Sequence, residues 1–202
     1  MNSIAKSPLA TSILAAAALA LSACEGAAVP AAEPPLAGAP IGGEFELSNT
    51  AGETVRWADF EGRYRIVYFG YAYCPDICPT DVQRTIQGLD QFSADQPDRA
   101  AKVQPIFISI DPERDTPEVI DQFTSAFSDD LIGLTGTPEQ LKATAKTFAS
   151  TFSKLPETAD GSYLMDHTRS VLLFDPAGKP LALLPADEGA DAVTQELAKW
   201  VS

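Results

Sequence analysis

The chain has 202 residues, 45% of them hydrophobic and 21% charged, and its 28 acidic residues outnumber its 14 basic ones to give a net charge of -14. A strongly acidic surface repels phosphate backbones and anionic lipid headgroups, so the composition argues against a nucleic-acid-binding protein and against a polybasic membrane patch. Three cysteines and one histidine exclude a four-cysteine zinc site, a two-histidine metalloprotease site and a scaffold with several disulfides.

Residues 1–23 are typical of a secretory signal peptide. They contain one cation, Lys6, no acidic residue, and an apolar run over residues 9–21 that is shorter than a membrane-spanning helix requires. The run ends in LSAC at positions 21–24, which resembles the lipobox of bacterial lipoproteins. The resemblance implies cleavage before Cys24 and attachment of a diacylglycerol to its sulfur. A plain signal peptide or an uncleaved anchor, with an incidental cysteine, is the alternative.

Residues 24–40 are predicted to form a flexible tether. After Cys24 the segment consists mostly of Ala, Pro, Gly and Glu, with four prolines and no aromatic residue. Such a composition does not build a packed core. We therefore expect a folded domain over residues 41–202, held by a lipid anchor at the periplasmic side of the inner membrane in a bacterial cell envelope.

The first elements of the domain are predicted to be strands. Residues 45–47 and 54–57 flank a turn-rich connection, which favours an opening β-hairpin. Residues 66–71 (IVYFGY) form a continuous apolar, β-branched and aromatic run, as expected of a strand that is buried on both faces.

A helix and a second buried strand follow. Apolar residues recur at helical spacing over residues 79–92, and Thr80 with Gln83 makes a plausible capping box at the start of that helix. Residues 103–110 are again almost wholly apolar, which predicts another strand with both faces covered.

The rest of the chain completes an α/β pattern. Thr116 and Thr137 each precede Pro and Glu, which predicts an N-cap and the first turn of a helix at both places. Residues 171–174 and 181–184 bracket the turn sequence DPAG and favour a hairpin, and residues 190–201 favour a closing helix. This order is that of an α/β, thioredoxin-like sandwich with an N-terminal β-hairpin.

Two cysteines lie between the first buried strand and the helix after it. Cys74 and Cys78 are separated by three residues, and Pro75 and Pro79 restrain the loop between them. The carboxyl end of a central strand is where open α/β sheets place their chemistry, and a helix N-terminus favours thiolate. The pair is therefore expected to bind a soft metal or to exchange dithiol and disulfide, with a structural disulfide as the simpler alternative.

The single histidine, His167, precedes the predicted strand over residues 171–174. A lone histidine is usually a surface or hydrogen-bonded core residue. Two thiolates suit Cu(I), however, and one added imidazole gives a set that can hold copper in either oxidation state. Zinc accepts the same atoms, but its structural sites need a fourth protein ligand. Met165 offers a weak thioether, although core packing is the usual role of that side chain.

Three motifs carry a family resemblance. They are YFGYAYCPDICPT at residues 68–80, SIDPERDTPE at residues 109–118, and DHT at residues 166–168 followed by LFDPAG at residues 173–178. In this order they resemble the signatures of the Sco/SenC family and span nearly the whole domain. The resemblance implies a membrane-tethered, thioredoxin-like copper protein that helps to assemble the binuclear copper centre of cytochrome c oxidase.

The same resemblance implies the site. Cys74, Cys78 and His167 would be the ligands of a copper ion, and the two cysteines would also be a redox-active pair. The implied partner is cytochrome c oxidase subunit II or another copper-accepting protein, served by copper delivery, by reduction of its cysteines, or by both. Asp111 either orients groups near the site or is a turn carboxylate. A thiol-disulfide oxidoreductase or peroxidase without a metal is the alternative function.

Overall fold

The computed structural model describes Met1 and residues 32–202, so residues 2–23 of the predicted signal peptide, Cys24 and residues 25–31 of the predicted tether lie outside the described residues. The segment Glu33–Ser202 folds as one unit. No helix in the described part of the chain combines the length and the apolar character that crossing a bilayer requires.

A seven-stranded sheet forms the centre of this unit, in the strand order β2-β1-β5-β4-β3-β8-β9, and a separate two-stranded sheet pairs β6 with β7. The strands are β1 (Glu46–Asn49), β2 (Thr54–Arg56), β3 (Tyr64–Gly70), β4 (Val103–Ser109), β5 (Ile132–Thr135), β6 (Phe152–Lys154), β7 (Met165–His167), β8 (Val171–Phe174) and β9 (Pro180–Leu184). The helices are the 3-10 helix η1 (Trp57–Phe60), α1 (Ile77–Asp95), α2 (Pro97–Ala100), α3 (Pro117–Ser125), α4 (Pro138–Thr147) and α5 (Ala190–Trp200).

The two strands that were predicted to be buried on both faces occupy the middle of the sheet. Every residue of β3 and of β4 is buried, and the two strands pair in parallel. The opening hairpin β1-β2 and the hairpin β8-β9 are antiparallel, as their turn residues predicted. The predicted thioredoxin-like α/β sandwich with its N-terminal hairpin is confirmed.

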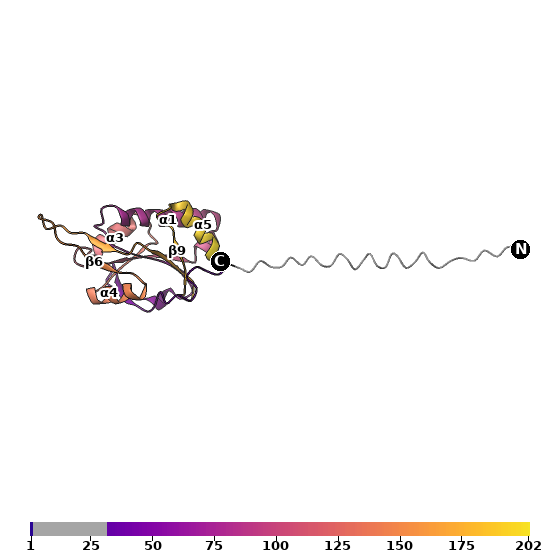
Figure 1. Ribbon diagram of the computed structural model, residues 1–202, viewed down its shortest axis with the longest axis horizontal. Helices are drawn as coiled ribbons and strands as arrows, with labels where there is room; N and C mark the ends of the chain where they lie inside the picture. The colour runs from indigo at the N-terminus through magenta and orange to yellow at the C-terminus, as the bar shows by residue number, and fades with distance from the viewer. Residues whose placement is uncertain (2–31) are drawn as a thin grey trace. The chain divides into compact units, whose positions relative to one another are not determined.

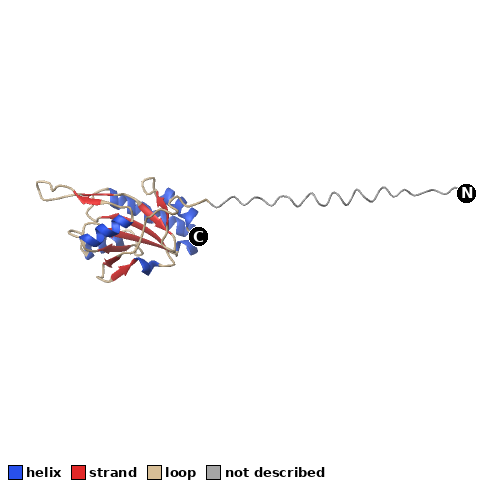
Figure 2. Cartoon of the chain, turned by 60° about the horizontal axis from the view of Figure 1, so that its bottom comes forward, coloured by secondary structure: helices blue, strands red, loops and turns tan. Residues whose placement is uncertain are grey.

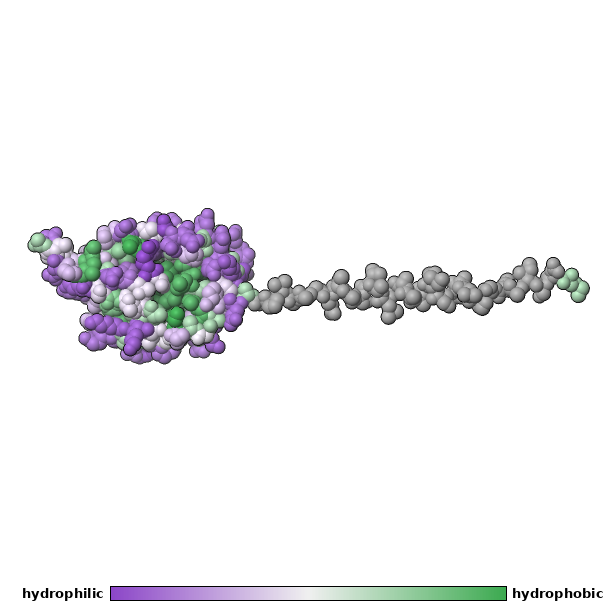
Figure 3. Space-filling view, in the orientation of Figure 1, coloured by the Kyte–Doolittle hydropathy of each residue, from purple (hydrophilic) through white to green (hydrophobic). Residues whose placement is uncertain are grey.

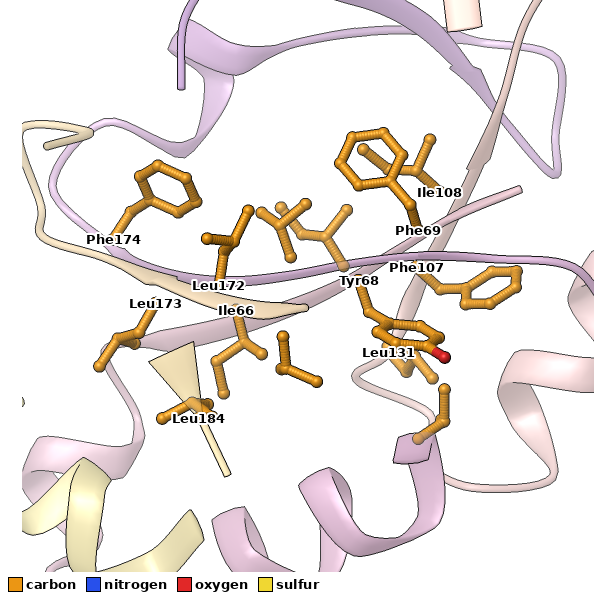
Figure 4. Close-up of a cluster of buried hydrophobic side chains, with 14 of the residues drawn as sticks. Ile66, Tyr68, Phe69, Phe107, Ile108, Leu131, Leu172, Leu173, Phe174 and Leu184 are labelled. Atoms are coloured by element: carbon orange, nitrogen blue, oxygen red, sulfur yellow. The ribbon is translucent and has the colours of Figure 1, made fainter. Parts of the chain in front are cut away.

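Helices cover both faces of the sheet, with α1, α3 and α5 on one side and α4 on the other (Figure 1). Because side chains alternate along a strand, β3 sends Phe69 to the α4 side and Ile66 and Tyr68 to the α1 side (Figure 4). On the α4 side Trp57 makes edge-on contacts with Phe148 and Phe174, each at 5.1 Å between ring centroids. This aromatic core fixes β3, and with it the loop that follows the strand.

Helix α1 begins earlier than the sequence predicted. Its first residue is Ile77 rather than Pro79, so Cys78 lies in the first turn. The predicted capping box of Thr80 and Gln83 is wrong, because the Thr80 hydroxyl lies inside the helix and donates to the backbone oxygen of Asp76 at 2.8 Å. A proline is tolerated anywhere in a first turn, where backbone N–H groups have no helical partner, so Pro79 does not mark the start.

The predicted starts of the next two long helices are confirmed. Thr116 caps α3 by accepting from the backbone N–H of Val119, and Thr137 caps α4 by accepting from that of Gln140. A hydroxyl at the N-cap satisfies a helix donor that would otherwise have no partner. These caps fix where the chain turns after β4 and after β5.

Three strands were not predicted from the sequence, namely β5, β6 and β7. Strand β5 has four residues and lies between β1 and β4, whereas β6 and β7 form a ribbon of three residues each outside the main sheet. The loop that joins the ribbon strands projects beyond the sheet in Figures 1 and 2. The ribbon carries His167 at its end.

The contacts of the folded unit begin several residues before the predicted boundary at Ile41. The backbone N–H of Leu36 donates to the oxygen of Leu181 at 3.0 Å, and both Leu36 and Ile41 pack against the core. The surface is largely hydrophilic, with hydrophobic side chains gathered in the middle of the face drawn in Figure 3. This agrees with the acidic composition of the chain.

Candidate metal and redox centre

The two cysteines lie on either side of the start of α1. Cys74 is partly exposed in the loop after β3, and Cys78 is buried in the first turn of the helix. The backbone N–H of Cys78 donates to the Cys74 sulfur at 3.3 Å, and both cysteines are free thiols. The Cys74 sulfur is thus held at the N-terminus of α1, where the helix dipole stabilises negative charge.

Gly70, the last residue of β3, makes room for the Cys78 sulfur. A Cβ atom at this position would lie 3.3 Å from that sulfur, 3.0 Å from the Phe107 ring and 2.8 Å from the Tyr68 ring. The last two distances are shorter than side chains tolerate without movement. The absence of a side chain at Gly70 therefore allows the helix to bring Cys78 directly against the end of the central strand.

The two thiols have opposite acidities. For Cys74, burial works against ionisation, but hydrogen bonds from the backbone N–H groups of Asp76 and Cys78 outweigh it and lower its pKa. For Cys78, burial dominates and raises the pKa of the thiol. Cys74 is therefore the more reactive nucleophile of the pair, and Cys78 is the protected member.

We expect iodoacetamide to alkylate Cys74 at least about tenfold faster than Cys78 in the metal-free, reduced protein, because each pKa unit changes the thiolate population about tenfold. Since the pKa of Cys74 is lowered, its rate should level off at a lower pH than that of Cys78. Mass spectrometry of the peptides across a pH series measures both rates, and a Cys24→Ser background removes the third thiol. Equal rates and equal pH profiles would contradict this assignment.

His167 comes from the ribbon and contacts Cys78, the buried member of the pair. Its Nε2 lies 3.3 Å from the Cys78 sulfur, and its Nδ1 lies 3.0 Å from the backbone oxygen of Thr168. Because a carbonyl oxygen only accepts, Nδ1 carries the hydrogen, and the Nε2 lone pair faces the sulfur. This is the tautomer that a metal-binding imidazole needs.

Two tyrosines fix the plane of the imidazole. The Tyr68 and Tyr71 rings meet the His167 ring almost at right angles, with centroid distances of 6.1 and 6.0 Å. Burial, the largest cause, raises the pKa of Tyr71 to about 12, so its phenol stays neutral at physiological pH. Sequence reasoning did not single out either tyrosine, because both belong to a run that reads simply as a buried strand.

A buried carboxylate also holds the cysteine loop. One oxygen of Asp115 accepts from the backbone N–H of Ala72 at 2.9 Å and from the Ser109 hydroxyl at 2.5 Å. The bond to Ala72 ties the chain two residues before Cys74 to the segment after β4. Asp115 was missed because a carboxylate in an acidic loop gives no sign in the sequence of being buried.

The Asp111 carboxylate lies in a neighbouring cluster. It accepts from Arg114 Nε at 2.6 Å and from the Tyr163 hydroxyl at 2.9 Å, while Arg114 stacks on the Tyr163 ring at 3.6 Å. These hydrogen bonds link the loop after β4 to the projecting loop of the ribbon. Asp111 supports the ribbon that carries His167 and makes no hydrogen bond with Cys74, Cys78 or His167 among the described residues.

The structure thus brings the three candidate ligands together in pairs, with Cys78 in contact with both of the others. Among the described residues, no three His, Cys, Asp or Glu side chains converge as a ready metal site. Cys24, the predicted lipidation site, lies outside the described residues. Two soft sulfur donors and one imidazole nitrogen form a donor set suited to copper, and the two thiols can also close a disulfide.

Comparisons with known proteins all identify the same family. The family model described as SCO1/SenC matches residues 33–202. The human mitochondrial SCO1 homolog is 38% identical over 68% of this chain and 45% of its own length, and the protein SenC of Rhodobacter capsulatus is 41% identical over 67% and 59%. The chain therefore spans about half the length of the curated relatives that it matches.

A solved structure extends this likeness to the fold. The structure of Bradyrhizobium japonicum ScoI with copper bound is 34% identical, with a TM-score of 0.70 over 79% of this chain and 99% of that one. From the family model and these relatives, this chain belongs to the SCO1/SenC family.

Proposed function

We propose that this chain is a copper-binding protein that helps to assemble the binuclear copper centre of cytochrome c oxidase. The observation that carries the proposal is the contact of 3.3 Å between Nε2 of His167, the only histidine of the chain, and the Cys78 sulfur, beside the second thiol of Cys74. The likeness to copper-bound ScoI supports the choice of metal.

Copper is the cargo of the proposed reaction. Cys74, Cys78 and His167 would hold it, because two thiolates stabilise Cu(I) and the added imidazole accommodates Cu(II). The hydrogen bond of Nδ1 to the Thr168 oxygen keeps the other imidazole nitrogen available for the metal. The proposed acceptor is cytochrome c oxidase subunit II or another copper-accepting protein.

The paired thiols also support a second function, reduction of a disulfide in the acceptor or in another substrate. The opposite acidities of the partly exposed Cys74 and the buried Cys78 favour it, since one would attack and the other would then resolve the mixed disulfide. This exchange requires both thiols but no imidazole. The role of His167 therefore separates the two functions.

Spectroscopy of the copper-loaded protein tests the proposal. Wild-type protein loaded with Cu(II) should show a thiolate-to-copper charge-transfer band, and His167→Ala should lose it. Met165→Leu is the matched control on the same ribbon, because it conserves side-chain volume and leaves both thiols and the imidazole in place. An unchanged band in His167→Ala would remove the imidazole from the site, whereas absence of the band in the wild-type protein would favour the metal-free oxidoreductase.

We further propose that Cys24 anchors the protein to the membrane as a diacylglyceryl cysteine, on the periplasmic side of the inner membrane. We expect wild-type protein to partition with membranes and Cys24→Ala to be recovered in the soluble fraction, because two acyl chains suffice for stable attachment. Fractionation followed by mass spectrometry of the N-terminal peptide measures this. Wild-type protein that is soluble and cleaved after another residue would contradict the anchor.

A further inference from the structure

An ion pair with a buried carboxylate lies beside the contact between Cys78 and His167. The carboxylate of Asp81, in α1, accepts from Arg169 Nε at 2.9 Å and from Arg169 Nη2 at 2.7 Å, in a two-pronged arrangement. The same carboxylate accepts from the Tyr68 hydroxyl at 3.2 Å. The Asp81 side chain is 2% exposed and that of Arg169 is 43% exposed.

Asp81 and Arg169 each lie close in the chain to one of the proposed copper ligands. Asp81 follows Cys78 by three residues and so lies almost one helical turn further along α1, whereas Arg169 follows His167 by two residues. The ion pair therefore joins the same two segments that the contact between sulfur and imidazole joins. Among the hydrogen bonds of the described residues, these are the side-chain links between α1 and residues 165–170.

The ribbon needs such a link more than the main sheet does. Strands β6 and β7 pair over three residues each and have no further strand beside them, and an isolated two-stranded ribbon is only marginally stable. After His167, Thr168 bonds to Thr151, which continues the ribbon without connecting it to α1. The side chain of Arg169, the next residue, connects this end of the ribbon to α1.

We propose that the ion pair of Asp81 and Arg169 positions His167 at the proposed copper site, by holding the end of β7 against the first turns of α1. That His167 is positioned for copper rests on the proposed function. That the ion pair holds the ribbon against α1 rests on the metal-free geometry alone. Asp81 and Arg169 act as positioning residues, because their side chains form hydrogen bonds with each other and with Tyr68 and not with a ligand atom.

Arg169→Gln is the first test variant, because Arg169 is half-exposed and its loss is less disruptive than loss of the buried Asp81. Asp81→Asn is the second, since it keeps the shape of the side chain and removes its charge. Arg84→Gln is the matched control, because Arg84 also lies on α1 but donates to the backbone oxygens of Ala186 and Asp187 instead. Circular dichroism of each full-length variant establishes that it is folded.

The copper measurement is a competition titration with Cu(I). We expect Arg169→Gln and Asp81→Asn to lose about 10- to 100-fold in affinity, which is the usual effect of removing a residue that orients a metal ligand. The control should not change. In a His167→Ala background the same two substitutions should have no further effect, because residues that act through one another are not additive. A similar loss of Cu(I) affinity in the wild-type and the His167→Ala backgrounds would overturn the proposal. A general structural role would lower the affinity whether or not His167 is present.

A metal-free measurement separates this proposal from the proposed function. If the ion pair holds the ribbon over Cys78, alkylation of Cys78 by iodoacetamide should become at least about tenfold faster in Arg169→Gln and stay unchanged in Arg84→Gln. Unchanged protection of Cys78 in a folded Arg169→Gln variant would overturn the positioning role. If the wild-type protein binds no Cu(I) while this protection depends on Arg169, the proposed function fails and the positioning role stands.

Discussion

Replacing Cys74 with serine is expected to abolish tight binding of Cu(I). A hydroxyl is a poor ligand for a soft metal, and the variant leaves one thiol where two are needed. Removal of a residue that merely orients a ligand costs about 10- to 100-fold in affinity, so removal of a ligand should cost more than about 100-fold. Competition with a Cu(I) chelator of known affinity measures the loss. The fold should survive, because Cys74 is partly exposed at the edge of the core.

The third cysteine provides the control for this measurement. Cys24→Ser also removes one cysteine from the chain, but the proposed site does not include it. We expect this variant to bind one Cu(I) with wild-type affinity. Undiminished, stoichiometric binding by Cys74→Ser would show that the sulfur of Cys74 is not a ligand.

Oxidation of the pair and occupancy by copper are expected to exclude each other. The metal needs both thiolates, and a disulfide between Cys74 and Cys78 removes them. At a free Cu(I) concentration of about 100 times the dissociation constant, binding should stabilise the reduced protein by about 2.7 kcal/mol. For a domain of this size that raises the melting temperature by about 5–10 °C. Calorimetry of the reduced protein with and without Cu(I) measures the shift.

Prior oxidation should cancel that increase, and bound Cu(I) should protect the thiols from oxidants. The control is the Cys74→Ser variant, which forms no disulfide with Cys78 and should show neither the thermal shift nor the protection. If the oxidised protein bound Cu(I) as tightly as the reduced protein, the sulfurs of Cys74 and Cys78 would not be the copper site. That result would favour the metal-free function.

The parts of the fold that could be predicted are those with local signals. Strands β3 and β4 are mostly apolar, and Thr116 and Thr137 carry the N-cap chemistry of α3 and α4. Strand β5 has only four residues, and its partners β1 and β4 come from elsewhere in the chain. The pairing of β5 therefore cannot be predicted from the residues of β5 alone. The same holds for the ribbon, where a loop separates two strands of three residues each.

For the site, the sequence predicted the chemistry better than the geometry. The spacing of Cys74 and Cys78 indicated a metal or redox pair, but the contact of Cys78 with His167 joins residues 89 positions apart, and the family resemblance, not the spacing, linked them. Asp81 reads as an ordinary acidic residue on a helix, and its partner Arg169 is 88 positions away. An ion pair between residues so far apart in the chain has no local pattern, so only the fold reveals it.

The separate ribbon has a consequence for the release of a cargo ion. The sulfurs are fixed by the loop after β3 and by α1, whereas the imidazole is carried by two strands that pair over only three residues each. We therefore expect the ribbon to open at a lower free energy than the central sheet. In the proposed site, withdrawal of the ribbon would change the coordination number from three to two while the sulfurs stay in place. The lifetime of the bound ion would then be set by local opening of the ribbon, and an acceptor could approach the exposed side of the ion without any unfolding of the domain.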